Sequence, residues 1–159
     1  MLKQILFGGT PIPGIAANVG LLILRASIGL MLAFGHGMGK MTAEGRAGME
    51  GFLTKLNVPA PGAAAFMAMF AEFFGGLMLA MGLLTRVGAA LITFTMLVAV
   101  MTAHRNDPFF MHPGPGGAKE PALLYMLPAL AFLLIGSGRY GVDALLRGRD
   151  ADTLPDPRI

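Results

Sequence analysis

The stretch "MAMFAEFFGGLMLAMGLL", residues 67–84, is apolar from end to end except for one carboxylate, Glu72. The rest of the chain has the same character, since 55% of its 159 residues are hydrophobic and only 13% are charged. Soluble globular domains carry about 25% charged residues. The composition therefore predicts an integral membrane protein.

Four segments are long and apolar enough to cross a bilayer, for which roughly 20 apolar residues span about 30 Å of hydrocarbon. These segments are residues 15–37, 60–84, 85–104 and 120–138. Each must be helical, because the bilayer core offers no water to satisfy an open backbone. The sequence therefore predicts an all-α, up-down four-helix membrane bundle, with a single domain over residues 1–146.

Two further segments have a different composition. Residues 43–57, "AEGRAGMEGFLTKLN", place apolar side chains at a spacing of 3 and 4 with charges opposite. This pattern predicts a short amphipathic helix at the membrane interface, between the first and second spans. Residues 147–159 are polar and contain two prolines, which predicts a disordered cytoplasmic tail.

Lysine and arginine in the short loops predict the orientation of the chain. The face with both termini carries Lys3, Arg86, Arg139, Arg147, Arg149 and Arg158, and the opposite face carries Lys40, Arg46, Lys55, Arg105 and Lys119. Because three of the first set closely follow the last span, the positive-inside rule places both termini in the cytoplasm of a bacterial-type inner membrane. The net charge of +3 fits contact with anionic lipid headgroups and does not indicate nucleic-acid binding.

Two charged residues lie inside the predicted spans. Arg25 is near the middle of the first span and Glu72 near the middle of the second, at similar depth when residues are counted from the helix ends. An isolated charge at the bilayer centre costs about 2.5–3.5 kcal/mol, so such residues face the bundle interior and find a partner. We therefore expect Arg25 and Glu72 to pair, either as a structural contact or as part of a proton or quinone site.

More polar residues gather toward the outer face. Arg25, Gly29, Leu32, His36 and Lys40 follow one another at helical spacing and form one stripe on the first span. His104 ends the third span and Glu120 begins the fourth, at the same face. The candidate ligand-binding residues are therefore Arg25, Glu72, His36, Lys40, His104 and Glu120.

Metal and haem sites are weaker interpretations of these residues. His36 and His104 are candidates for haem ligation, and with Glu120 they are candidates for a metal site, but they have no paired ligand spacing. Interfacial hydrogen bonding is favoured, so no metal site is predicted. The 13 methionines are scattered and indicate apolar packing, and the absence of cysteine excludes thiol chemistry and Cys-ligated clusters within this chain.

Three motifs together resemble a known family. They are "HGMGK" at residues 36–40, "AEFFGGLMLAMGLLTR" at residues 71–86 and "GSGRYGVD" at residues 136–143. In this combination the chain resembles the DoxX family of small four-helix membrane proteins, over about residues 21–146. The resemblance implies functional or structural roles for the family's polar positions, which here are Arg25, His36, Lys40, Glu72, Arg86, Arg139, Tyr140 and Asp143.

The resemblance also implies a class of function. DoxX-like proteins include a quinone-reducing subunit of an archaeal thiosulfate:quinone oxidoreductase and subunits linked to bacterial oxidative-stress complexes. We therefore expect a membrane subunit of a redox system that is not catalytic alone, binds quinone or quinol near Arg25 and Glu72, and receives electrons from a partner protein. The alternative is a non-enzymatic adaptor that recruits redox or stress-response partners. A small-molecule or ion carrier is disfavoured, because the sequence shows no broken helices or inverted repeats. A homo-oligomer is also possible.

Overall fold

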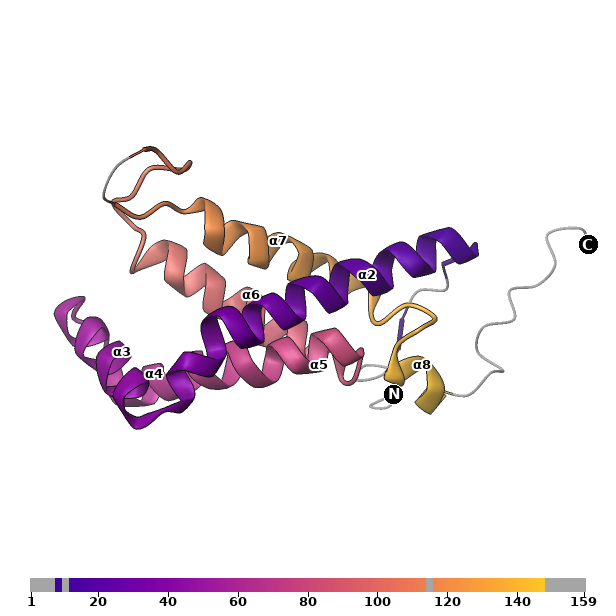
Figure 1. Cartoon of the computed structure of the whole chain (residues 1–159), viewed down its shortest axis with the longest axis horizontal. Coiled ribbons are helices and arrows are strands. Elements are labelled where there is room, and N and C mark those ends of the chain that lie inside the picture. Colours follow the sequence, from indigo (N-terminus) through magenta and orange to yellow (C-terminus); the bar gives the residue numbers. More distant parts are fainter. Residues whose placement is uncertain (1–7, 10–11, 114–115, 148–159) are drawn as a thin grey trace, which may run out of the picture.

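The computed structural model describes residues 8–9, 12–113 and 116–147. Within these residues the chain is helical and contains no β-strand, which confirms the all-α prediction. Residues 148–159 of the predicted disordered tail lie outside the described part of the chain. Figure 1 shows an elongated molecule with helix α3 (Ala43–Lys55) toward one end and helix α8 (Val142–Arg147) toward the other.

The first long helix has three sections. Helix α2 (Ile15–Leu32) continues through a π-helical turn, η1 (Ala33–Gly37), and a 3-10 turn, η2 (Met38–Met41). Asn18 stabilises its start, because the side-chain amide donates to the carbonyl oxygens of Ile12 and Gly14 at 2.7 and 2.8 Å. The helix extends beyond the predicted end at residue 37, since no proline or left-handed glycine interrupts it there.

A short helix follows, where the sequence predicts one. Helix α3 begins after Thr42, whose side-chain hydroxyl accepts a hydrogen bond from the Gly45 amide at 3.0 Å. This N-cap satisfies one of the free amide groups of the first turn. Leu53 on its apolar face is buried, and the helix packs against α4 (Pro61–Phe70).

The second long helix also contains a π-helical turn. Helix α4 continues through η3 (Ala71–Gly75) into α5 (Gly76–Met81), so the stretch around Glu72 is one helix over residues 61–81. It ends at Gly82, whose φ of 68° is the left-handed conformation that glycine adopts most easily. In the described part of the chain, residues 15–41 and 61–81 are the helices long and apolar enough to cross a membrane.

The remaining apolar helices are shorter than predicted. Helix α6 (Thr85–Met101) and helix α7 (Glu120–Ile135) have 17 and 16 residues and each end three residues before the expected position. Gly136, with a φ of 84°, ends α7 because a helix cannot continue through that conformation. At about 1.5 Å per residue these helices are roughly 24–26 Å long, slightly less than the hydrocarbon thickness.

The long helices pack around one core. Helix α2 contacts α5, η3 and α5 contact α6, α6 contacts α7, and α7 contacts α2. The core comprises Leu32, Leu79, Ala89, Ile92, Met96, Ala122, Ala129 and Phe132. Where α2 meets α5 the two backbones nearly touch, since a Cβ atom on Gly76 would lie 2.7 Å from the carbonyl oxygen of Gly29. Small residues at a helix crossing permit this close approach.

Several polar side chains are buried, and many large apolar side chains are exposed. The buried polar residues of the described chain are Asn18, Arg25, Glu72, Thr85, Ser137 and Asp143. Large apolar side chains are exposed on every long helix, including Ile23, Phe74, Phe94 and Leu124. Soluble proteins rarely expose so many large apolar side chains, whereas a lipid-facing surface is apolar.

Candidate functional site

Two π-helical turns in the described part of the chain pack against each other. Turn η1 carries His36 and turn η3 carries Glu72, and the two turns are in contact. Gly37 makes this approach possible, because a Cβ atom there would lie 2.5 Å from the Phe73 amide nitrogen. Such π-turns often occur at functional sites, where the extra residue redirects side chains. The contact of η1 with η3 therefore marks the first candidate site.

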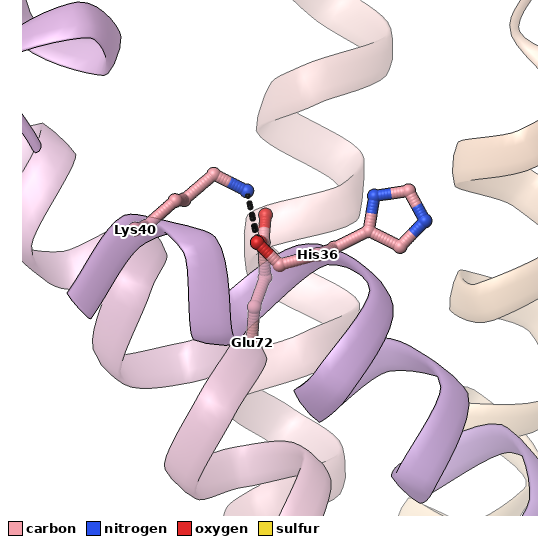
Figure 2. Close-up of polar contacts among 3 residues, drawn as sticks. All are labelled: His36, Lys40 and Glu72. Atoms are coloured by element: carbon pink, nitrogen blue, oxygen red, sulfur yellow. Dashed lines mark hydrogen bonds and ion pairs between the residues drawn. The ribbon is translucent and has the colours of Figure 1, made fainter. Parts of the chain in front are cut away.

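Glu72 forms an ion pair with Lys40 at this contact. The Lys40 Nζ donates to Glu72 Oε2 (Figure 2). It also donates to the His36 carbonyl oxygen at 3.1 Å. The Glu72 side chain is 8% exposed and that of Lys40 is 20% exposed. The pair therefore reaches from the interior of the helix assembly to its surface, with the carboxylate on the inner side.

The His36 ring points away from this ion pair. Figure 2 shows the imidazole turned to the side opposite the Lys40 ammonium. Its ring packs edge to face on Tyr125 of α7, with the centroids 5.4 Å apart. The predicted stripe on the first span is thus broken after Leu32, because the extra residue of the π-turn makes Gly37, and not His36, the buried position.

An apolar pocket is lined in part by Glu72. Its volume is about 180 Å³, and it opens between α3, α4, η3 and α6. Its lining residues are Met49, Phe52, Leu53, Val58, Ala64, Met67, Ala68, Ala71, Glu72, Leu91, Phe94, Thr95, Val98, Ala99, Thr102 and Ala103. Glu72 is the one ionisable residue in this lining, and its other neighbours are apolar except for two threonines. A mostly apolar pocket with few polar groups is typical of small-molecule sites.

The structure contradicts the predicted pair of Arg25 with Glu72. Arg25 is 1% exposed, and its guanidinium donates to three backbone carbonyl oxygens. Nη1 lies 3.2 Å from Leu79 O and 2.5 Å from Ala80 O, and Nη2 lies 2.7 Å from Tyr140 O. The carbonyls of Leu79 and Ala80 belong to the last turn of α5, where the helix dipole favours a cation.

The prediction that Arg25 pairs with Glu72 is wrong because α2 and α5 are shifted along each other. The start of α2 extends beyond the end of α5 (Figure 1), so Arg25 meets the last turn of α5 and not its middle. Gly37, which approaches the backbone of Glu72 and Phe73, is roughly twelve residues further along, or about 18 Å in an α-helix. The two charges are therefore both in the interior, as predicted, but at different ends of it.

Asp143 completes the polar cluster around Arg25. Its carboxylate accepts hydrogen bonds from the amides of Leu84 and Thr85 at 2.7 and 2.8 Å and from the Thr85 hydroxyl at 2.7 Å. The aspartate thus caps the start of α6 and holds the first turn of α8 against it. Because these contacts connect helix ends through backbone groups, we interpret the role of the cluster as structural.

The remaining candidate residues lie near the segment between α6 and α7, with His104 in that segment and Glu120 in the first turn of α7. His104 Nδ1 lies 2.8 Å from Asp107 Oδ2, and Glu120 Oε2 accepts from the Met111 amide at 3.0 Å. In the described residues no group of three or more His, Asp or Glu side chains could hold a metal ion. The alternative metal site of His36, His104 and Glu120 is therefore not formed.

Two comparisons with known proteins bear on this site. The family model described as DoxX matches residues 20–105, just over half of the chain. A Bacillus subtilis (strain 168) protein named "Putative oxidoreductase CatD" is 29% identical over 127 residues, which cover 79% of this chain and 86% of that protein. No solved structure matches the chain. The matched segment contains Lys40 and Glu72 together with α6, which lines the pocket.

Proposed function

Because the chain belongs to the DoxX family, we propose that it is a membrane subunit of a quinone-linked redox system. In this proposal the pocket beside Glu72 binds the ring of a quinone or quinol, and a partner protein supplies the electrons. The observation that carries the proposal is the single carboxylate in the wall of an otherwise apolar pocket. The similarity to a protein named as an oxidoreductase supports the same class of function.

The proposed location is a bacterial-type inner membrane. We propose that the four apolar segments cross it in an up-down bundle, with residues 1–146 as one domain and both termini in the cytoplasm. Buried charges inside an exposed apolar surface support this arrangement, as does the basic segment after the last span. Helix α3 then lies at the outer interface and covers the pocket.

The proposed chemistry divides between this chain and its partner. Reduction of a quinone to a quinol takes up two electrons and two protons, and the reverse step releases them. The chain contains no cysteine, so thiols or Cys-ligated clusters would come from a partner. In this proposal Glu72 exchanges a proton with the bound ring, and its ion pair with the partly exposed Lys40 supports a link from that carboxylate to the surface.

The adaptor alternative predicts a different occupant for the same pocket. An adaptor would use its surface to recruit partners, and the pocket would then hold lipid tails without selecting a quinone. The two proposals are separated by whether the pocket controls the quinone content of the purified protein.

We expect Ala64→Phe to reduce the quinone that co-purifies in mild detergent to about a tenth, since the new ring fills the space of a bound ligand. Ala64 lines the pocket, whereas its neighbour Ala63 is exposed and does not. Ala63→Phe is therefore the matched control and should keep the quinone content unchanged. Quinone is extracted, oxidised and quantified per mole of folded protein. Equal quinone content in both variants, or none in the unaltered protein, would contradict the proposal and favour the adaptor.

A further inference from the structure

The pocket is lined by few polar groups, and one of them is a carboxylate. Its polar lining residues are Glu72, Thr95 and Thr102. The Thr102 hydroxyl already donates to the Val98 carbonyl oxygen at 2.7 Å, so its proton is not free for a ligand. Thr95 can donate or accept and so does not discriminate between ligands. The hydrogen-bonding preference of the pocket is therefore determined mainly by the Glu72 carboxylate.

The cations near Glu72 lie outside the pocket. Lys40 contacts Glu72 Oε2 but is not among the lining residues, and Arg25 is bound to backbone carbonyls at the far end of α5. A carboxylate in an ion pair accepts hydrogen bonds without donating any, and Glu72 pairs with Lys40. Among the described residues Oε1 has no hydrogen-bond partner, which leaves one oxygen of the pair for a ligand.

We infer that this pocket selects the reduced, hydroxyl-bearing form of its ligand, a hydroquinone, over the oxidised quinone. This inference rests on the proposed function and specifies the redox form that binds. A hydroquinone presents O–H donors, which form charge-assisted hydrogen bonds to a carboxylate. A quinone presents only carbonyl acceptors, and an acceptor placed against an ionised carboxylate oxygen is repelled by it.

The expected preference is about tenfold or more in dissociation constant, since a hydrogen bond to a charged group contributes more than a neutral one. It is measured by anaerobic isothermal titration calorimetry of the detergent-solubilised full chain. The probes are a decyl benzoquinone and its two-electron-reduced hydroquinone, kept reduced by ascorbate. Glu72→Gln should bring the two dissociation constants within about threefold of each other, because an amide can donate to a quinone and accept from a hydroquinone.

Two further variants serve as a control and as a replacement if Glu72→Gln does not fold. Thr95→Val should preserve the preference for hydroquinone, because the threonine does not discriminate. If Glu72→Gln does not fold beside the unpaired Lys40, the double variant Lys40→Met with Glu72→Gln replaces it and should show the same loss of preference.

The outcomes separate this inference from the proposed function. Quinone bound as tightly as hydroquinone, with both lost in Ala64→Phe, would overturn the inference and leave the proposed function standing. A preference that survives Glu72→Gln but is lost in Thr95→Val would also overturn it. If neither probe binds, the proposed function fails and the inference fails with it.

Discussion

Arg25→Met should lower the stability of the folded protein in detergent by about 3 kcal/mol or more. The substitution keeps the length and apolar stem of the side chain but removes the guanidinium donor of the Ala80 and Tyr140 carbonyl oxygens, and one of the two donors of the Leu79 carbonyl oxygen. A buried group that loses its hydrogen-bond partner costs about 1–3 kcal/mol. The midpoint of thermal unfolding, followed by far-ultraviolet circular dichroism, should fall by roughly 10 °C.

The matched control for this prediction is Arg105→Met. Arg105 is exposed in the segment after α6, so its loss should shift the midpoint by less than about 2 °C. Glu72→Met combined with Arg25→Met should not restore stability, because Glu72 is not the partner of Arg25. Full restoration by that double variant would instead support the pair of Arg25 with Glu72.

Lys40→Met should lower stability by about 2 kcal/mol, because it leaves the Glu72 carboxylate in an apolar interior without its cation. Removing one member of a fully buried ion pair costs about 3–5 kcal/mol. We expect a smaller loss of folding free energy here, because the Lys40 side chain is 20% exposed and that end of the ion pair is partly solvated. Thermal unfolding in detergent measures the effect.

The double variant Lys40→Met with Glu72→Met should recover most of the lost stability, since no charge is then left unpaired. Replacement of a whole buried ion pair by apolar residues is often neutral or stabilising. Lys55→Met is the control, because Lys55 is exposed at the end of α3 and its loss should be close to neutral. If Lys40→Met changes the unfolding midpoint as little as Lys55→Met does, the ion pair does not contribute to the stability of the fold.

The helices could be predicted from the sequence because their signal is local. A run of about 20 apolar residues has few alternatives to a helix, and the caps at Thr42 and Gly82 are of the expected residue types. The extent of each helix was less predictable. Helix α7 ends at Gly136 and the first helix continues to Met41, because backbone conformation and not hydropathy decides these ends.

The partners of the buried charges could not be predicted, because they depend on how far one helix is shifted along another. The close contact of Gly29 with Gly76 sets that shift between α2 and α5, and it brings Arg25 to the end of α5. The π-turn at residues 33–37 then exchanges His36 for Gly37 on the inner face. Neither feature has a signature in hydropathy or in residue spacing.

Part of the candidate site could still be identified from composition. An ionisable residue inside an apolar span indicates a functional position, and Glu72 is where the pocket and the ion pair meet. The pocket itself could not be predicted, since its walls are ordinary apolar side chains from four elements. Asp143 belongs to the motif "GSGRYGVD", but its role as a cap for α6 requires the fold.

The central claim is that a quinone ring binds beside Glu72 and not beside Arg25. Photolabelling with an azido-substituted decyl quinone, followed by peptide mass spectrometry, tests this most directly. The account predicts adducts on the pocket-lining residues of α3, α4 and α6, which disappear with excess unlabelled quinone and in Ala64→Phe. Competable adducts confined to the neighbours of Arg25, in residues 21–28 and 136–143, would contradict it.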